Sequence, residues 1–478
     1  MPELIATAWN ELVADDLLPV YLTGLYLAYL VPLSIWIVLQ KREPAATISW
    51  LVSLATLPYL GFLIYYFLGP QRIHRQNRRR SRARRALPKP PGGATPTPEA
   101  IELARLGQAS TALPATTATT AVLLVDGAAK YARLLADVAG ARDHVHLEYY
   151  IYDPDRTGTA LRDALAERAR AGVTVRLLVD AVGSSKLDER WLRPLREAGA
   201  RVCYFHPMRW TRPWQRPWLN LRTHRKIVVI DGTVAYTGGM NITDDQDETL
   251  RADAYRDLHL RLEGDVVAQL QRVFVEDWAY ATGEPPLSVP DAIPCTGAIV
   301  AQVLTSGPDN VLEPIHRLHV SAIHAATRRA WLVTPYFVPG EAARMALTSA
   351  ALGGLDVRLL VPKMSDSRLV TFAARSYYDE LLEAGVKLYE YGPRLLHSKA
   401  LLCDDDLAMV GSANFDHRSF RLNFEVQVLF RDRGMADALA AHIEAECQAC
   451  TRVRHDRNRS LWRSRLPEGL ARLVSPVL

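Results

Sequence analysis

Two long uncharged apolar runs stand near the start of the chain, at residues 17–40 and 45–69. They contain 24 and 25 residues. A helix of that length, rising about 1.5 Å per residue, crosses a hydrocarbon core of about 30 Å. The pattern therefore predicts two transmembrane helices. Only residues 41–44 separate them, which predicts a hairpin with both outer ends on one side. Pro32 and Pro58 lie inside the runs, where each can kink its helix or make the second run re-entrant.

Further along the chain, helix-like and strand-like patterns alternate. A helical pattern over 161–172 precedes a strand-like apolar run over 173–179, and 377–385 precedes 386–391 in the same way. Both helical patterns end in glycine. Such alternation is typical of an α/β fold with helices on the faces of its sheets.

The second part of this region repeats the first. Residues 195–207 match 381–393, and residues 175–179 match 357–361. We therefore expect a tandem duplication with an α/β fold in each half. The predicted order is a transmembrane hairpin, a basic juxtamembrane segment with a linker, a first half and a second half, at 1–70, 71–118, 119–290 and 291–478.

Basic residues are concentrated beside the apolar runs, in a chain whose net charge is +5. By the positive-inside rule, the flank after the second run is cytoplasmic, because the turn holds only Lys41 and Arg42. The duplicated region is therefore predicted to face the cytoplasm. A cleaved signal peptide is a poor alternative, since acidic residues occupy the place of its basic end. The basic flank contains eight arginines: Arg72, Arg75, Arg78, Arg79, Arg80, Arg82, Arg84 and Arg85.

The candidate chemistry lies in a pattern that occurs twice, 173 residues apart. Each copy reads H-x-K-x4-D-x6-G-(G/S)-x-N and leads into a predicted strand, at 227–230 or 400–403. A lone His-x-Lys is usually a strand end with solvated side chains, but two matched copies are not expected by chance. The first copy contains His224, Lys226, Asp231, Gly238, Gly239 and Asn241, and the second contains His397, Lys399, Asp404, Gly411, Ser412 and Asn414.

These residue types together favour the transfer of a phosphodiester. One histidine can attack phosphorus and form a covalent intermediate, while a second on the opposite side protonates the leaving alkoxide. The lysines and asparagines would stabilise the charged non-bridging oxygens of the transition state, and the glycines would let the backbone approach the phosphate. Asp231 and Asp404 belong to the pattern, although aspartate followed by Gly232 or Asp405 is also typical of a turn.

The scheme requires no metal or cofactor. Five cysteines, an odd number, fit a reducing cytoplasm. Cys447 and Cys450 form a C-x2-C pair, but no second pair accompanies them, so two thiols on a helix face are expected rather than a zinc site.

With its paired pattern, the chain resembles the phospholipase D superfamily. Four further segments are similar to its bacterial cardiolipin synthase branch: Asn-Phe-Asp-His-Arg-Ser at 414–419, Thr-Pro-Tyr-Phe-Val-Pro at 334–339, Ser-Asp-Ser at 365–367 ahead of Tyr377 and Tyr378, and Leu-Val-Ser-Pro at 473–476. Gly239 departs from the family pattern, because many members have serine there, as at Ser412. The lost hydroxyl is expected to weaken one phosphate contact.

The resemblance implies that a pseudo-two-fold axis brings His224 and His397 together. It favours His224 as the nucleophile and His397 as the acid/base, with the reverse assignment left open by the near-symmetry of the halves. Each imidazole also needs a partner that fixes its tautomer. Asp257 and Glu425, in strand-like runs of the two halves, are the candidates that the resemblance supports, against ordinary solvated carboxylates.

The resemblance implies a phosphatidyltransferase of the bacterial inner membrane, which joins two phosphatidylglycerol molecules into cardiolipin and releases glycerol. A phospholipase D hydrolase and a synthase with phosphatidylethanolamine as donor are the alternatives, followed more distantly by a nuclease and an inactive membrane scaffold. Expected partners are phosphatidylglycerol, cardiolipin and anionic membrane lipids, not nucleic acid. A homodimer is left open.

One insertion distinguishes the halves. Pro207 lies 17 residues before His224, whereas Pro393 lies only 4 before His397. Tryptophan favours the bilayer interface and arginine favours lipid phosphate, so the extra loop is predicted to contact lipid headgroups, with packing of the tryptophans on the second half as the alternative. The residues concerned are Trp210, Trp214, Trp218, Arg209, Arg212 and Arg216.

Overall fold

The computed structural model describes residues 18–39, 44–68, 98–206, 221–287, 295–455 and 459–475. The chain divides into an N-terminal unit (residues 1–71 and 210–220) and an α/β unit (residues 72–209 and 221–478). Three features predicted above lie outside the described residues, namely the arginine cluster at 72–85, the turn residues Lys41 and Arg42, and the tryptophan–arginine loop with Arg209, Trp210, Arg212, Trp214, Arg216 and Trp218.

The N-terminal unit begins, within its described part, with helix α2 (Leu18–Val38). Of the described helices, α2 alone is long and apolar enough to cross a membrane. Its 21 residues extend over about 31 Å at the usual helical rise. Pro32 lies inside the helix without ending it. The first predicted spanning helix is therefore present.

The second apolar run does not form one helix. It forms α3 (Pro44–Thr56) and α4 (Leu60–Leu68), with 13 and 9 residues. The break falls at Pro58, which lacks a backbone N–H and clashes with the preceding turn. Tyr59 then takes a positive φ of 65°. The prediction of a second continuous spanning helix is therefore wrong for the described residues.

The two short helices run in opposite directions. The Tyr65 ring of α4 lies 5.0 Å from the Trp50 ring of α3, whereas 15 residues of straight helix would separate them by about 22 Å. The Tyr65 ring also lies 5.5 Å from that of Trp36 in α2, and the Tyr59 ring 5.3 Å from that of Tyr29. Thus α4 runs in the same direction as α2. The last part of α4 lies beside the last part of α2, close to where the chain passes from α2 to α3. The second run therefore doubles back on itself at Pro58, which agrees with the re-entrant alternative predicted for it.

The α/β unit contains two large sheets with the same internal strand order. The second sheet has an extra strand at each edge, β1 and β18. Without these two strands, and in the order given below, the first four strand pairings of each sheet are antiparallel and the last two are parallel. The predicted duplicated α/β fold is confirmed. The first sheet is β2 (Thr120–Val125), β8 (Leu258–Glu263), β7 (Val234–Gly238), β6 (Ile227–Ile230), β3 (His144–Tyr149), β4 (Thr174–Asp180) and β5 (Arg201–Phe205). The second is β1 (Thr116–Ala118), β9 (Ile299–Ser306), β17 (Glu425–Arg431), β15 (Leu407–Gly411), β14 (Ala400–Cys403), β10 (Arg329–Val333), β12 (Asp356–Pro362), β13 (Lys387–Tyr391) and β18 (Cys450–Arg452).

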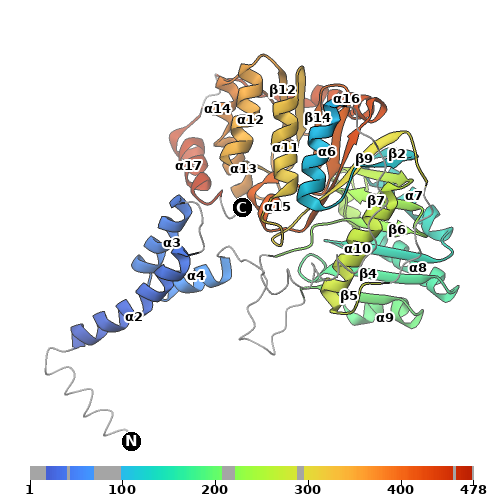
Figure 1. Cartoon of the computed structure of the whole chain (residues 1–478), viewed down its shortest axis with the longest axis horizontal. Helices are drawn as coiled ribbons and strands as arrows, with labels where there is room; N and C mark the ends of the chain where they lie inside the picture. The colour runs from blue at the N-terminus through green and yellow to red at the C-terminus, as the bar shows by residue number, and fades with distance from the viewer. Residues whose placement is uncertain are drawn as a thin grey trace, which may run out of the picture. The chain divides into compact units, whose positions relative to one another are not determined.

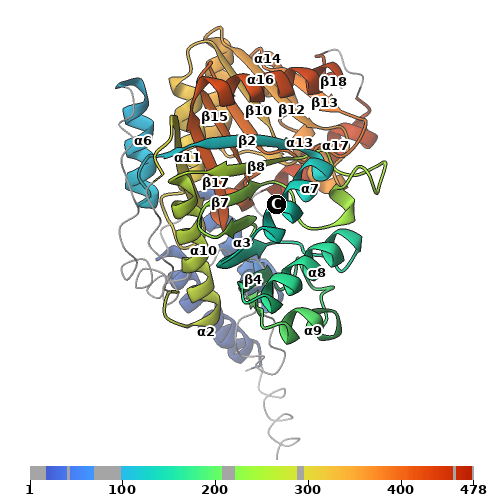
Figure 2. The ribbon, with the colours of Figure 1, turned by 90° about the vertical axis from the view of Figure 1, so that its right-hand side faces the viewer.

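The two sheets pack face to face through a shared apolar core. Val229 of β6 and Leu402 of β14 are both fully buried in this core, together with residues of α10 (Val266–Thr282) and α16 (Arg433–Gln448). Separate clusters cover the outer faces, and Figures 1 and 2 show the helices that contribute to them. Over the first sheet these are α7 (Asp126–Ala139), α8 (Arg156–Arg170) and α9 (Glu189–Glu197), and over the second α11 (Pro314–Ala325), α12 (Glu341–Leu352), α13 (Arg368–Arg375) and α14 (Tyr378–Glu383).

Local sequence explains the predicted alternation. In α8, Leu161 and Leu165 are four residues apart and point into the core, and the Asp155 side chain caps the helix by accepting from the Gly158 N–H at 2.9 Å. Strand β3 lies beside β4, the strand that follows α8, and every residue of β3 is buried. The outer helices cover one of its faces and α10 covers the other, where the His146 ring stacks on that of Phe274.

Part of the predicted linker is structured. Helix α6 (Pro98–Thr111) packs against α11 and β9, with Leu103 in the outer core of the second half. β1 pairs with β9 as well. The residues just before the first half are therefore built into the second. The remaining elements are β11 (Phe337–Val338), β16 (Phe415–Asp416), α15 (His417–Arg421), the short helices η1 (Asp244–Gln246) and η2 (Leu461–Arg465), and α17 (Leu466–Leu473).

Candidate active site

Each motif histidine stands just before a central strand and is tied to the other half of the protein. The His224 N–H donates to the Phe424 carbonyl at 2.9 Å, and the His397 N–H donates to the Arg256 carbonyl at 2.7 Å. Isolated parallel β-bridges pair Thr223 with Phe424 and Leu396 with Arg256. The backbone before each histidine is thus fixed against the backbone that precedes a carboxylate of the opposite half.

The side chains repeat this crossing. His224 Nδ1 lies 3.0 Å from Glu425 Oε2, and His397 Nδ1 lies 2.5 Å from Asp257 Oδ2. The two carboxylates predicted as orienting partners therefore contact histidines, each from the opposite half. A carboxylate on Nδ1 keeps the proton on that nitrogen, which leaves the lone pair on Nε2.

Burial and charge set the protonation of these pairs. Burial lowers the pKa of His224 to about 4. Burial, followed by the Lys399 charge, also lowers the pKa of His397. For Asp257, burial alone would raise the pKa, but the Lys399 and His397 charges outweigh it and lower the pKa. Near neutral pH the site therefore holds neutral imidazoles beside an ionised carboxylate.

Glu425 is ionised for a similar reason. Burial would raise its pKa, but the contact with His224, the Lys226 charge and the Ser412 hydroxyl together lower it. A buried carboxylate held in this way is a strong hydrogen-bond acceptor, so it fixes the ring of its histidine firmly.

Two buried lysines supply positive charge to the same place. Lys226 Nζ donates to the His224 carbonyl at 2.7 Å, and Lys399 Nζ lies 2.8 Å from His397 Nδ1. Burial lowers the pKa of Lys226 to about 7 and that of Lys399 to about 8. The charges of both lysines act on both histidines. This arrangement suits an anionic phosphate, whose charge would restore full protonation of the lysines.

The two motif asparagines are held by hydrogen bonds to neighbouring segments. Asn241 Oδ1 accepts from the Ile151 N–H at 3.2 Å, which directs the amide NH2 away from that contact. The Asn241 carbonyl accepts from Lys130 Nζ at 2.8 Å and Tyr131 Oη at 2.9 Å. Asn414 is also buried, and its N–H donates to Ser419 Oγ at 3.2 Å. These hydrogen bonds hold the backbone of both asparagines in place.

Three further motif residues, Gly239, Gly411 and Ser412, lie against the two carboxylates or the strand that carries one of them. The Ser412 hydroxyl donates to Glu425 Oε2 at 2.5 Å, so in this structure it supports the carboxylate that contacts His224. A Cβ on Gly239 would lie 2.2 Å from Asp257 Oδ1, and one on Gly411 would lie 2.3 Å from the Val426 carbonyl. Gly239 thus makes room for the Asp257 side chain, and Gly411 for the backbone of the strand that carries Glu425.

Asp231 and Asp404 lie away from the histidines, at the far ends of β6 and β14. Asp231 accepts three backbone N–H bonds at 2.8–2.9 Å, from residues 142–144. Asp404 accepts from the N–H groups of residues 327–329. Both have a φ of 51°, which fits a turn. Their place in the predicted catalytic set is therefore corrected: they join the turn of each half to the neighbouring strand.

Three further side chains reach the histidines. The Tyr150 ring lies 5.0 Å from the His224 ring, and the Tyr255 ring lies 5.5 Å from the His397 ring. Gln246 Nε2 lies 3.3 Å from His397 Nδ1. None of them belongs to the repeated pattern. Tyr255 stands two residues before Asp257, and this proximity is the one sequence signal that pointed to it.

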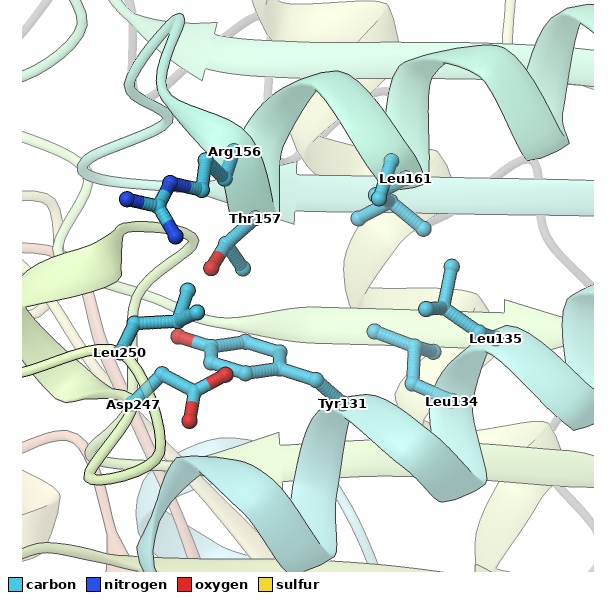
Figure 3. A pocket seen from close by; sticks show the side chains of 9 residues that line it. Tyr131, Leu134, Leu135, Arg156, Thr157, Leu161, Asp247 and Leu250 are labelled. Carbon is cyan, nitrogen blue, oxygen red and sulfur yellow. The ribbon is translucent and has the colours of Figure 1, made fainter.

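A separate cavity of about 200 Å³ opens between α7 and α8 (Figure 3). Leu134, Leu135 and Leu161 form its apolar wall, and Arg156 and Asp247 lie at its other end. No residue that lines it belongs to either motif. We therefore place the candidate site by the histidine contacts and not by this cavity. Within the described part of the chain, no group of three or more His, Cys, Asp and Glu side chains is arranged to hold a metal ion.

Comparisons with known proteins agree with this geometry. The pattern described as "Cardiolipin synthase, PLD-like domain" matches residues 134–278 and 320–448, and "Phospholipase_D-nuclease N-terminal" matches residues 30–70. A cardiolipin synthase from Geobacillus sp. (strain WCH70) is 38% identical over 463 residues, which cover 92% of this chain and 90% of the relative. One from Halalkalibacterium halodurans is 37% identical over 472 residues, covering 93% and 92%.

The chain belongs to the phospholipase D-like cardiolipin synthase family. It is an enzyme of this type, and its N-terminal apolar helix associates it with a membrane. The crystal structure of phosphatidylserine synthase from Haemophilus influenzae Rd KW20 shares the fold, with a TM-score of 0.58 and 14% identity over 79% of this chain and 100% of that one.

The corrected position of the motif aspartates predicts a separation of stability from chemistry. Asp231→Ala and Asp404→Ala should each destabilise the protein by about 1–3 kcal/mol, because backbone N–H groups lose their acceptor. The turnover of the folded fraction should stay close to that of the unchanged protein. Thermal unfolding and initial rates measure the two effects. His224→Ala and His397→Ala are the matched controls. The first should abolish turnover, the second should lower it roughly 10²- to 10⁴-fold, and both should largely keep their stability. An aspartate variant that loses turnover at full stability would contradict the structural role.

Proposed function

We propose that the protein transfers a phosphatidyl group from one phosphatidylglycerol to the terminal hydroxyl of a second, giving cardiolipin and glycerol through a phosphohistidine. The crossed pairs carry this proposal: two buried neutral imidazoles, each aligned by an ionised carboxylate, lie with two lysines in one site. Family membership supports the choice of lipid.

In the first step, His224 Nε2 forms a bond to phosphorus and the bond from phosphorus to the glycerol oxygen breaks. His397 Nε2 gives its proton to that oxygen. The negative charge of the bound phosphodiester opposes the effect of burial and favours the protonated form of His397 that this step needs. The two lysines and the asparagine amides stabilise the charge on the non-bridging oxygens.

In the second step, the acceptor hydroxyl gives its proton to His397 and forms a bond to phosphorus, while the bond to His224 breaks. One phosphodiester replaces another and the proton returns to His397. The exchange therefore balances without a nucleotide. Water competes with the acceptor for the phosphohistidine, so synthesis needs a site that favours lipid over water.

We also propose that the α/β unit faces the cytoplasm and that the segment before α2 lies on the opposite side. The support is the direction of α4, which runs back towards the end of α2, and the order of the chain, in which one basic segment follows α2 and the other follows α4. The positive-inside rule assigns both basic segments to the cytoplasmic side. These basic residues would also attract anionic lipids, at about 1 kcal/mol each.

The lipid reaction is tested by incubating the purified protein with labelled phosphatidylglycerol, with and without phosphatidylethanolamine. We expect cardiolipin and glycerol from phosphatidylglycerol alone, at equal amounts. Phosphatidic acid as the sole product would show a hydrolase. Cardiolipin that forms only when phosphatidylethanolamine is present would identify the other donor. His224→Ala should form no product of any kind.

The nucleophile is tested by trapping the phosphatidyl-enzyme with radiolabelled lipid and mapping the labelled peptide. We expect label on His224. Because Glu425 orients His224 from the other half, Glu425→Gln should slow the labelling, whereas Asp257→Asn should mainly slow the release of label to the acceptor. His397→Ala should reduce turnover by roughly 10²- to 10⁴-fold, the usual size of acid–base catalysis. Label on His397 would reverse the two assignments.

The orientation is tested with an Ala6→Cys variant in bacterial spheroplasts and a membrane-impermeant maleimide. Residue 6 should be labelled in intact spheroplasts. The five native cysteines all lie in the α/β unit, and Cys295 is exposed, so it should be labelled only after the membrane is permeabilised. A hairpin of two full spans would keep residue 6 and Cys295 on the same side, and labelling of both together would contradict the re-entrant arrangement.

A further inference from the structure

The two histidine–carboxylate pairs have different supporting donors. In the His224–Glu425 pair, the Ser412 hydroxyl donates to Glu425 Oε2 at 2.5 Å. The matching position in the first copy of the pattern is Gly239, which has no side chain to donate. A Cβ there would lie 2.2 Å from Asp257 Oδ1, so a serine does not fit beside Asp257 in this arrangement.

Gln246 supplies a donor to Asp257 from another direction. Its side chain is buried, with 1% of the residue exposed, and it ends the short helix η1. Its Nε2 lies 3.2 Å from Asp257 Oδ2, and its Oε1 accepts the backbone N–H of Asn241. Gly127 permits this close packing, because a Cβ on Gly127 would lie 2.0 Å from the Gln246 carbonyl oxygen.

The orientation of the Gln246 amide follows from its neighbours. The Asn241 N–H can only donate, so it requires the oxygen end of the amide. The NH2 end can only donate, and it donates to Asp257, because the nearby His397 Nδ1 carries its own proton and accepts nothing. Asp257 Oδ2 then accepts from two groups, His397 Nδ1 at 2.5 Å and Gln246 Nε2 at 3.2 Å.

We propose that Gln246 is a positioning residue for the His397–Asp257 pair and does for Asp257 what the Ser412 hydroxyl does for Glu425. It holds the carboxylate turned towards His397 and spreads part of its negative charge. A carboxylate with a second donor is less basic, so it attracts the imidazolium less strongly and the histidine gives up its proton more readily. This inference rests on the proposed acid/base role of His397.

The test uses the full chain in detergent with bis(p-nitrophenyl) phosphate as the probe. The first release of p-nitrophenolate reports attack by the nucleophile, and the steady state that follows reports hydrolysis of the phosphohistidine with His397 as base. Gln246→Met removes both hydrogen bonds at nearly the same volume. Gln246→Glu keeps the acceptor for Asn241 but places an anion beside Asp257.

We expect Gln246→Met to lower the steady-state rate roughly tenfold, which is about 1.4 kcal/mol, and to move the acidic limb of its pH profile to higher pH. Gln246→Glu should move this limb further, because a second negative charge favours protonated His397. The first release should change little in either variant. Ser412→Ala, which weakens the other pair, should slow the first release instead.

Gln269→Met is the matched control for stability. The Gln269 side chain is also buried and also makes two hydrogen bonds, to the Pro114 carbonyl and from the Val303 N–H, but it lies outside the histidine pairs. The Gln269→Met variant should have a lower melting temperature and an unchanged pH profile of the steady-state rate. If Gln246→Met behaves in the same way, or if both Gln246 variants leave the steady state and its pH profile unchanged, the positioning role is overturned.

The outcome is separable from the proposed function. If His397 is the nucleophile, the effects of the Gln246 and Ser412 variants exchange between the two kinetic phases, and Gln246 still acts on His397. If the protein uses another lipid, the lipid assay fails while the response to the phosphodiester probe stays the same.

Discussion

The pairing of each histidine with a carboxylate from the opposite half is the interaction on which the rest of the site depends. Neither half holds a complete pair by itself. The two sheets must therefore dock in one register, which the shared apolar core and the backbone bonds at His224 and His397 enforce. Packing between the halves and formation of the site are one event, because a shift of one sheet against the other would move each carboxylate away from its histidine.

Burial makes this arrangement both costly and useful. Removing Asp257, Glu425, Lys226 and Lys399 from water is unfavourable unless each charge finds a partner. Here every charge lies beside one of opposite sign or beside a hydrogen-bond partner, and the imidazoles stay neutral. The same low-dielectric surroundings strengthen the attraction for an anionic phosphodiester and for the charge that develops in its transition state. The site is thus prepared for its ligand before the ligand arrives.

The N-terminal unit adds a constraint of another kind. An apolar helix that associates with the membrane holds the enzyme where its lipids are present, which raises the local concentration of donor and acceptor relative to their amounts in solution. Helices α3 and α4 pack on α2 through aromatic side chains, with Tyr65 between Trp36 and Trp50. A compact bundle of this kind satisfies its backbone hydrogen bonds internally, apart from the break at Pro58, as an apolar surrounding requires.

The sequence by itself determined the duplication, the α/β class, the first spanning helix and the residues of the repeated pattern. These features depend on local periodicity and on spacing within one half, which a linear pattern records directly. Tertiary structure alone decided which carboxylate serves which histidine, because the partners lie 201 and 140 residues apart. It also decided which backbone N–H groups Asp231 and Asp404 bind from the turns that the sequence indicated, gave Gln246 a place beside Asp257, and decided between the two arrangements that Pro58 allows for the second apolar run. In each of these cases the deciding contact is made by the packing of distant segments, and hydrophobic periodicity carries no information about it.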